Sequence, residues 1–530
     1  MHNRVSFGAA GELAGQMFSA PRPQHAVRSA AASQVIHIAP HPPPQALCCM
    51  LRRGRVVCGC SCTGRWKEAG RGVSMTRADG WLAGSALVLL LAAVCAAKPS
   101  AEYRARWSDP ALQKRIDENI EARRKADAAV TVVDAADRPV ADARVAAVQK
   151  THEFLFGANA FMVGGFDTPE KNAAYEAAFG HLFNFATVPF YWSDLEPKPG
   201  QVRFTKDSPP IYRRPPPDLV VEFGRRHGLT LKGHPLIWHS WLPPWLPKDD
   251  EARMHELMAG RFAQVADRYA ASIRIWDVTN EVLAHGNKGG PLPEGYLEWS
   301  YAEAARRFRP DNILMINETT GGAHGGRGEG AAYYRQIQGL LGKGLRVDGV
   351  GFQFHLFGAG AYERLLEGKL HPPQDLYAVY STYEKFGKPL YITEITVPQR
   401  SAPDGQEEQA EVVANLYRLW FSVPRMAGIT WWNLADGTAV KGEDVYRGGL
   451  LNEALQAKAA YRKLDELINK SWKTQAAGRT DSQGRFAFRG FCGTYAVTVE
   501  SPAGKREFQV NLSAGGPGAF RLVLASRLAP

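Results

Sequence analysis

Two glutamates follow short apolar runs, and their type and placement suit them for acid–base chemistry. The run at residues 275–281 ends on Asn280 and Glu281, and the run at residues 389–394 ends on Glu394. Apolar runs of this length are typical of buried strands in a parallel sheet, whose carboxyl ends meet at one edge. Either glutamate alone could be a solvated residue at a strand end. Together they predict hydrolysis of a glycosidic bond, which needs one carboxyl as acid and base and a second as nucleophile.

The region that must position these glutamates, residues 152–468, alternates apolar runs with longer amphipathic stretches. This alternation is typical of repeated βα units and predicts a (β/α)₈ barrel, an α/β fold whose chemistry lies at the carboxyl ends of the strands. In this arrangement Glu281 follows the fourth strand and Glu394 ends the seventh. The eight expected strands are residues 154–161, 183–189, 229–238, 273–279, 313–316, 347–354, 390–394 and 428–432.

Segments on both sides of the barrel region resemble the two halves of one β-sandwich. Residues 102–151 predict a helix at 109–127 and a hairpin at 128–150, and residues 470–526 predict further strands. The two segments resemble the first and second halves of the carboxypeptidase-regulatory-like domain. An isolated hairpin is marginally stable in water, so we expect a single accessory sandwich with the barrel inserted between its halves. The alternative is an N-terminal flap and a separate C-terminal module.

The first 74 residues carry most of the positive charge of the chain. They hold nine basic and two acidic residues, a net charge of +7, which leaves +4 of the total +11 for the remainder. Their composition predicts disorder, so the charge does not indicate a nucleic-acid-binding domain. Cys58, Cys60 and Cys62 lack the second cysteine pair or histidines of a zinc site.

Residues 75–97 have the pattern of a secretory signal peptide. Arg77 precedes an apolar run at 81–94, which is followed by Cys95 and two alanines. We expect translation to start at Met75, residues 1–74 to be a spurious extension, and the mature protein to be secreted, periplasmic or extracellular, with no membrane contact after cleavage. Cys492 would then be the one cysteine left, so no intrachain disulfide is expected.

Five motifs in the barrel region give the chain a resemblance to the family 10 glycoside hydrolases, which are mostly endo-1,4-β-xylanases. The resemblance covers roughly residues 154–468, and its strength lies in the order and spacing of the motifs. In chain order they are Gly233-His234-Pro235-Leu236-Ile237-Trp238-His239-Ser240 with Pro243 and Trp245, Trp276-Asp277-Val278 with Asn280 and Glu281, Gly351 with Gln353, His355 and Leu356, Ile392-Thr393-Glu394, and Gly449-Leu450-Leu451 with Lys458 and Tyr461.

The resemblance implies a role for each matching residue. Glu281 would be the general acid/base, which requires a raised pKa, and Glu394 the nucleophile. Asn280 would bind the 2-hydroxyl of the sugar at the cleavage point. The other implied substrate-binding residues are His234, Trp238, Gln353, His355 and Trp432, with Trp192, His239, Trp241 and Asn317 as further candidates; His239 could instead be a structural histidine.

The sequence also departs from the family pattern. The segment at 187–192 is two residues shorter than its counterpart and lacks the Glu, Asn and Lys that grip the sugar beyond the cleavage point. Trp241 replaces a glutamine, Thr396 replaces the aspartate two residues after the nucleophile, and Val440 stands near an expected tryptophan. We therefore expect a conserved cleavage subsite beside a glycone subsite rebuilt with aromatic residues.

The sequence as a whole predicts a secreted retaining hydrolase that cleaves internal β-1,4 linkages of xylan. Alternatives are the same mechanism on another β-glycan or a non-catalytic carbohydrate-binding barrel. Metal-assisted hydrolysis is disfavoured because no His-x-His pair follows the first strand. We expect no metal or cofactor, a polysaccharide as the binding partner, no nucleic acid, and a monomer.

Overall fold

The structure is a computed structural model that describes residues 50–52, 55–57, 99–285, 292–358, 360–502 and 504–524. The chain divides into two units, Met1–Leu82 and Ala83–Pro530. In the first unit, β1 (Met50–Arg52) pairs antiparallel with β2 (Arg55–Val57). The expected signal peptide at 75–97, and the remainder of the expected disordered extension, lie outside the described residues.

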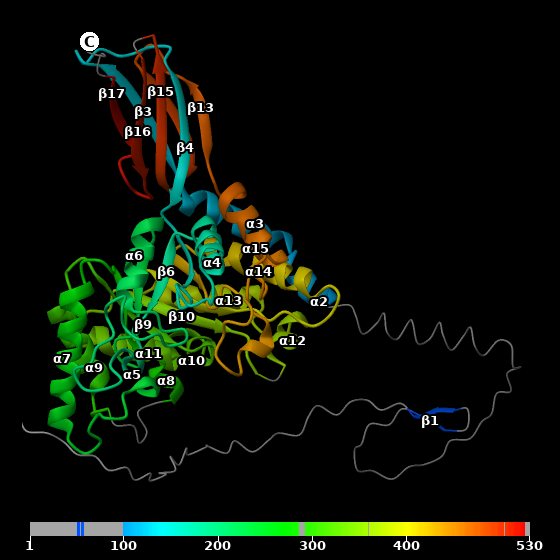
Figure 1. Cartoon of the computed structure of the whole chain (residues 1–530). Coiled ribbons are helices and arrows are strands. Elements are labelled where there is room, and N and C mark those ends of the chain that lie inside the picture. Colours follow the sequence, from blue (N-terminus) through cyan, green and yellow to red (C-terminus); the bar gives the residue numbers. More distant parts are fainter. Residues whose placement is uncertain are drawn as a thin grey trace, which may run out of the picture. The chain divides into compact units, whose positions relative to one another are not determined.

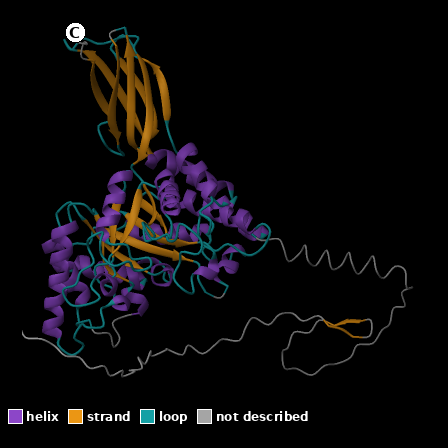
Figure 2. Ribbon diagram, viewed as in Figure 1, coloured by secondary structure: helices purple, strands orange, loops and turns teal. Residues whose placement is uncertain are grey.

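Eight parallel strands of the second unit form a closed barrel, which Figure 2 shows as orange strands among purple helices. The predicted (β/α)₈ fold is therefore confirmed. The barrel strands, in chain order, are β5 (Leu155–Asn159), β6 (Phe185–Pro189), β7 (Thr230–His234), β8 (Ile275–Asn280), β9 (Ile313–Glu318), β10 (Gly349–His355), β11 (Leu390–Thr396) and β12 (Met426–Trp431).

Each barrel strand lies within or beside its expected segment, and β7 differs most in length. It ends at His234 rather than Trp238 because Pro235 has no N–H to donate to the ladder. The two residues after Pro235 still run alongside β8: Leu236 donates its N–H to the Asp277 carbonyl at 2.9 Å, and Ile237 donates to the Val278 carbonyl at 3.2 Å. This continuation carries Trp238 towards the carboxyl end of the barrel.

Helices cover the outside of the barrel (Figure 1). Several begin at side-chain caps: Thr168 accepts the N–H of Lys171, and Asp250 accepts the N–H of Arg253. The helices are α4 (Pro169–Leu182), α5 (Trp192–Leu195), α6 (Pro217–His227), α7 (Glu251–Tyr269), α8 (Val282–His285), α9 (Tyr296–Arg307), α10 (Thr320–His324), α11 (Ala332–Gly342), α12 (Ala361–Leu366), α13 (Pro373–Glu384), α14 (Gly405–Ser422) and α15 (Ala459–Asp465).

The barrel strands carry one cluster of large apolar side chains and a separate set of buried polar ones. The apolar cluster consists of Phe185, Ile275, Met315 and Tyr391. The polar residues lie towards or beyond the carboxyl ends of their strands, where the fold places its chemistry. They are Asn159, Thr187, His234, Asp277, Asn280, Asn317, Gln353 and Glu394.

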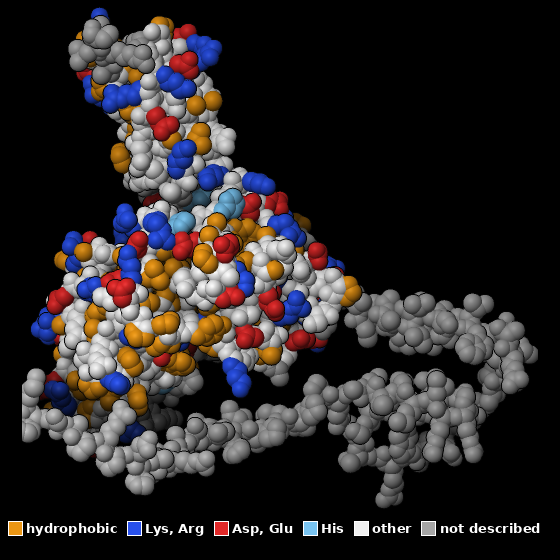
Figure 3. All heavy atoms as spheres, in the orientation of Figure 1, with side chains coloured by type: hydrophobic (Ala, Val, Ile, Leu, Met, Phe, Trp, Pro, Cys, Tyr) orange, Lys and Arg blue, Asp and Glu red, His pale blue; other side chains and the backbone are white. Residues whose placement is uncertain are grey.

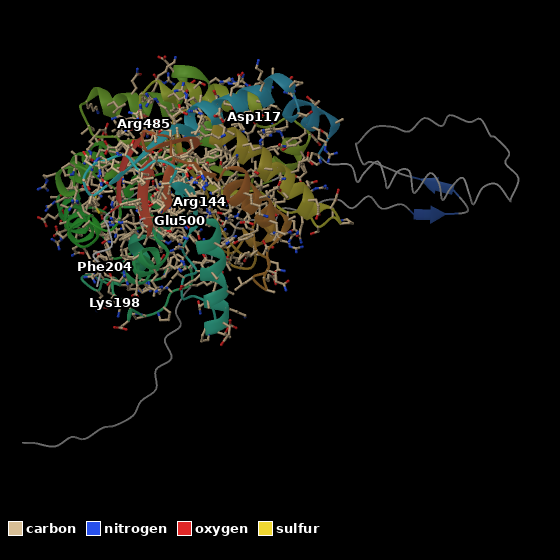
Figure 4. All side chains as sticks on the ribbon, turned by 90° about the horizontal axis from the view of Figure 1, so that it is seen from above. Asp117, Arg144, Lys198, Phe204, Arg485 and Glu500 are labelled. Carbon is tan, nitrogen blue, oxygen red and sulfur yellow. The ribbon has the colours of Figure 1, made fainter. Side chains whose placement is uncertain are left out.

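The flanking segments form two further sheets that share one core. One sheet has the order β13-β4-β15-β16, and the other has the order β14-β3-β17. Figure 4 shows Arg144 of β4 beside Glu500 of β15, its partner in register. The strands are β3 (Lys125–Asp134), β4 (Arg144–His152), β13 (Gln475–Arg479), β14 (Arg485–Phe491), β15 (Gly493–Ser501), β16 (Gly504–Leu512) and β17 (Ala519–Leu524).

Valines and leucines of both flanking segments fill the core between these sheets, among them Val130, Val145, Val497 and Leu512. The two chain ends thus form the expected accessory sandwich together. The physical reason is that neither segment could bury its apolar face alone. The resemblance of this sandwich to the carboxypeptidase-regulatory-like domain stays a prediction.

The expected helix at 109–127 is present as α3 (Pro110–Arg124), which follows α2 (Ala101–Trp107). Half-buried Arg124 ends α3 and donates hydrogen bonds of 2.6 Å to the carbonyls of Phe421 and Val423, which ties the start of β3 to the barrel helix α14. Cys492 is buried and forms no disulfide.

Lys/Arg and Asp/Glu side chains are interspersed over the face of the second unit seen in Figure 3. Within the described ranges, no helix is both long and apolar enough to cross a membrane.

Candidate active site

Glu281 and Glu394 lie at the same end of the barrel, where their strands place them. Glu281 directly follows β8, and its N–H donates to the Asn317 carbonyl at 3.0 Å. Its φ of 58° is in the left-handed region, which non-glycine residues seldom adopt. This turn directs the chain out of the strand and into α8. Glu394 lies inside β11 and is 3% exposed.

Gln353 of β10 binds both glutamates through one nitrogen. Its Nε2 donates to Glu281 Oε1 at 2.9 Å and to Glu394 Oε1 at 3.3 Å. These two oxygens can be no farther apart than the two bonds laid end to end, about 6.2 Å. That bound applies to one oxygen of each group, and it is compatible with the roughly 5–5.5 Å between the carboxyl groups of retaining glycosidases.

The two carboxyl groups have opposite pKa shifts. Burial, followed by the negative charge of Glu394, raises the pKa of Glu281 to about 7, against the opposing hydrogen bond from Gln353. Burial would also raise the pKa of Glu394, but the hydrogen bond from His355 and the charges of His234, His355 and Lys232 outweigh it and lower that pKa. Glu281 therefore keeps its proton up to about neutral pH, where Glu394 is already ionised.

Two histidines and an asparagine surround the Glu394 carboxylate. His355 Nε2 lies 3.1 Å from Oε2, and Asn317 donates its Nδ2 to Oε1 at 3.0 Å. His234 Nε2 lies 3.8 Å from Oε1. Because Asn317 also donates to Asn280 Oδ1 at 2.8 Å, the Asn280 amide nitrogen is the group left to meet a ligand.

A buried ion pair below the glutamates orients His234. Lys232 Nζ and His234 Nδ1 both lie 2.7 Å from the same oxygen of Asp277, and all three side chains are buried. The carboxylate must accept from the histidine, so the proton is on Nδ1 and Nε2 is directed towards Glu394. Asp277, which directly follows Trp276 on β8, thus acts on Glu394 through His234.

The two glutamates, Gln353 and both histidines line a cavity of about 450 Å³ at the carboxyl end of the barrel. Its walls come from the connections that follow β6 to β12. The lining residues are Tyr191, Arg213, Arg214, His234, Trp238, Trp241, Asn280, Glu281, Thr319, Thr320, Gly321, Gln353, His355, Phe357, Glu394, Trp432, Val440 and Glu443.

Aromatic rings cover one side of this cavity. Trp238 and Trp241 stack with their ring centroids 5.2 Å apart and an interplanar angle of 6°. Trp432 packs edge-on against His234 at 5.7 Å and against His355 at 5.9 Å. Flat apolar faces beside hydrogen-bonding groups suit a ligand that has both, such as a sugar ring.

Comparison with known proteins identifies the family. Residues 167–467 match the profile of glycosyl hydrolase family 10. The chain belongs to this family. The motifs around Glu281 and Glu394 had predicted this family.

The chain is also similar to several curated proteins and solved structures. Anti-sigma-I factor RsgI6 of Acetivibrio thermocellus is 29% identical over 421 residues, which cover 77% of this chain and 49% of that protein. Endo-1,4-beta-xylanase 3 of Hypocrea jecorina is 29% identical over 278 residues, which cover 50% of this chain and 70% of that protein. The chain thus spans about half the length of the first relative. Xylanase 10B from Thermotoga petrophila, solved with xylobiose, has a TM-score of 0.48 and 22% identity over 60% of this chain and 95% of that one.

The structure places most of the predicted family 10 site residues at this cavity and removes two of them from it. Trp192 is 3% exposed, and its Nε1 donates to Glu196 Oε2 at 2.9 Å, so it belongs to the core. His239 lies outside the lining and contacts Ser240 Oγ through Nε2 at 2.8 Å. Asn317 acts from below the lining through its bonds to Asn280 and Glu394.

Sequence reasoning missed the charged residues beside the rebuilt glycone subsite. Arg213 and Arg214 line the cavity, and the Arg214 guanidinium lies 3.7 Å from the centroid of the Tyr191 ring. The expectation of a glycone subsite rebuilt with aromatic residues stays a prediction, and the cavity carries these arginines beside its aromatic residues. The arginines come from an irregular connection between α5 and α6, and only adjacent prolines at 215–217 marked that stretch in the sequence. Glu443, also missed, follows β12 in another irregular connection.

No group of histidine, cysteine, aspartate or glutamate side chains in the described ranges is arranged to hold a metal ion.

Proposed function

We propose that this family 10 protein is a retaining glycoside hydrolase that cleaves internal β-1,4 linkages of xylan. Glu281 acts as the general acid/base and Glu394 as the nucleophile. The observation that carries the proposal is Gln353 Nε2, which hydrogen bonds both carboxyl groups and so holds them close together, as a retaining mechanism requires. The opposite pKa shifts of the two groups support the same assignment of roles.

In the first step, the Glu394 carboxylate attacks the anomeric carbon while the proton of Glu281 passes to the glycosidic oxygen. The bond to the leaving sugar breaks, and a covalent glycosyl-enzyme forms. In the second step, Glu281, now ionised, takes a proton from water, whose oxygen attacks the anomeric carbon and releases Glu394. Protons and charge balance over the cycle, and each glutamate ends in its starting state.

The neighbouring residues support both steps. His355 and Asn317 hold the Glu394 carboxylate at 3.1 Å and 3.0 Å and so fix its direction of attack. The Asn280 amide nitrogen would donate to the sugar 2-hydroxyl, a contact that strengthens as positive charge develops on the ring. Trp432, at the base of the cavity beside both histidines, offers an apolar face to the ring.

Xylan is proposed as the substrate from the family and from relatives that are named as endo-1,4-beta-xylanases. The decisive experiment is release of xylo-oligosaccharides from xylan by the full chain and by Glu394→Ala. Activity of the wild type that is lost in the variant would support the proposal. Release from another β-glycan but not from xylan would keep the mechanism and change the substrate, and equal activity of both proteins would overturn the nucleophile assignment.

We also propose that the protein is exported through the signal-like segment at 75–97. The support is the sequence pattern of that segment, a charged start followed by a short apolar run and small residues. N-terminal sequencing of the protein recovered from its native host tests this, since export with cleavage predicts a mature start close to Lys98. A mature chain that retains residue 60 would contradict it.

A further inference from the structure

Arg213 is a buried arginine that has no carboxylate partner in the described part of the chain. It is 3% exposed, and all hydrogen bonds that its guanidinium donates come from Nη1, to Asn433 Oδ1 at 2.6 Å and to the Thr438 carbonyl. Its Nε is buried without an acceptor. A buried charge of this kind is costly unless an opposite charge meets it.

The guanidinium lies at the boundary of two cavities. Arg213 and Arg214 line the cavity of the two glutamates and also a second one of about 480 Å³. The second cavity is walled by the connection after β5, residues 161–167, and by residues 206–219. Its charged lining consists of three basic residues, Lys206, Arg213 and Arg214, and one acidic residue, Asp167.

The other charged groups of this lining already have ionic partners. Arg214 Nε lies 2.9 Å from Asp194 Oδ2, Lys206 pairs with Glu222, and Asp167 lies 2.9 Å from Lys171 Nζ. Their charges are therefore largely balanced. Arg213 differs from them because its hydrogen-bonding partners, an amide oxygen and a backbone carbonyl, are neutral.

On the side of the catalytic cavity, Glu443 is the acidic residue whose negative charge could partly balance the positive charge of Arg213. Asn433 stands between them: its Oδ1 accepts from Arg213 and its Nδ2 donates to Glu443 Oε2 at 3.3 Å. Burial raises the pKa of Glu443, which weakens the negative charge it offers, although the charges of His355 and Arg213 oppose this shift. The positive charge of Arg213 is thus left for a ligand.

A guanidinium whose Nε has no acceptor can donate two parallel hydrogen bonds to a carboxylate. Neutral hydroxyl groups fit this pair of donors less well and carry no opposite charge. We propose that Arg213 binds the carboxylate of a uronic acid substituent carried by the polysaccharide chain, and that the second cavity holds this substituent. The inference rests on the proposed function, because the chain must lie across the two glutamates to bring a substituent to Arg213. Substrates decorated with uronic acid should therefore be preferred over neutral ones.

The test compares Arg213→Met with the wild type on glucuronoxylan and on the same polymer after its carboxyl groups are reduced to alcohols. The full chain is used throughout. The wild type should show a kcat/KM about 10- to 100-fold higher on the acidic polymer, as expected for a buried charge-assisted contact. Arg213→Met should lose most of this ratio, which is measured within one variant and so does not depend on its overall rate. Arg213→Lys, which keeps the charge without the fork, should give an intermediate ratio.

Lys206→Met is the matched control, because Lys206 lines the same cavity but is half-exposed and paired with Glu222. It should keep the ratio of the wild type. A wild type that treats the two polymers equally, or an Arg213→Met variant that loses activity on both in proportion, would overturn the inference, since a merely structural arginine affects both substrates alike. Equal binding of acidic and neutral oligosaccharides would overturn it as well.

Calorimetry with xylotriose, plain or carrying one glucuronic acid, separates this inference from the proposed function. Tighter binding of the acidic oligosaccharide by the wild type, lost in Arg213→Met, would support the uronate subsite even if neither polymer were cleaved. Cleavage of both polymers at equal rates would support the proposed hydrolase function and contradict the proposed uronate subsite.

Discussion

The carboxylate of Glu318 accepts the backbone N–H of Leu283 at 2.8 Å, two residues after Glu281. Glu318 ends β9, and its other oxygen accepts the N–H of Thr319 at 2.8 Å. It therefore anchors the start of α8 to the neighbouring strand, directly beyond the left-handed turn at Glu281. Its charge is also among the influences that raise the pKa of Glu281, after burial and Glu394.

Glu318→Gln should move the basic limb of the kcat/KM profile to lower pH, because an amide keeps an acceptor for the Leu283 N–H and removes the charge. The displacement should be small, since burial and Glu394 contribute more. Glu318→Ala should instead lose the anchor, with about 1–3 kcal/mol less stability for the unsatisfied N–H groups. Rate profiles from pH 4 to 9 and denaturant unfolding measure the two effects; an unmoved basic limb in Glu318→Gln would rule out the electrostatic role.

The wild-type kcat/KM should fall above about pH 7, where the raised pKa of Glu281 lies. The sign follows from the role of the group: as an acid it must be protonated, and its protonated fraction decreases as the pH rises through its pKa. Glu281→Ala should lose this limb. Its activity should drop about 10²–10⁴-fold on substrates with a sugar leaving group and far less on those with an activated aryl leaving group. An equal loss on both would contradict the acid role.

Hydrolysis should retain the anomeric configuration. Glu281 and Glu394 both accept from one Gln353 nitrogen, so the two carboxyl groups lie close together, as direct attack by a carboxylate on the sugar requires. Proton NMR of the first product formed should therefore show the β-anomer, with the α-anomer appearing only through mutarotation. Initial α-anomer would mean inversion and would remove Glu394 from the role of nucleophile.

Thr396→Val should lower kcat by about tenfold, the effect of losing one hydrogen bond near the nucleophile. His355 Nδ1 lies 3.0 Å from Thr396 Oγ1 while Nε2 faces Glu394, so the hydroxyl holds the ring in place. Valine has nearly the same shape, and the fold should be unaffected. Thr396→Ser, which restores the hydroxyl, is the control and should keep most of the activity; an unchanged kcat in Thr396→Val would exclude the orienting role.

Asp277→Asn should destabilise the barrel by about 3–5 kcal/mol, because it leaves the buried Lys232 ammonium without its counter-charge. Burial alone would raise the pKa of Asp277, but the charges of Lys232 and His234 outweigh burial and lower this pKa. The stability that ionised Asp277 adds to the folded state is therefore fully present above its unfolded-state pKa of about 4. This stability is lost as the pH falls through the lower folded-state pKa. Denaturant titrations at pH 7 measure the loss, and adding Lys232→Met should recover part of it. A variant as stable as the wild type would refute this account.

The sequence alone predicted the barrel and the positions of its chemistry because both depend on local patterns. Apolar runs of strand length alternate with amphipathic stretches, and such runs specify strands regardless of what they pack against. Glu281 and Glu394 could be placed because each directly ends or follows such a run. The motifs around His234, Gln353 and His355 carried the family relationship, and these residues gather around the cavity as expected.

Tertiary structure decided what depends on the path of irregular segments. Trp192 and Trp241 looked alike in the sequence, yet the first is buried beside Glu196 and the second lines the cavity. Arg213 lies more than twenty residues after β6, and its position is set by contacts with Asn433 and Thr438, over two hundred residues away. Periodicity carries no information about such contacts. The sequence thus determined the fold and the placement of Glu281 and Glu394, whereas the charge beside them was decided by loops whose conformation comes from packing.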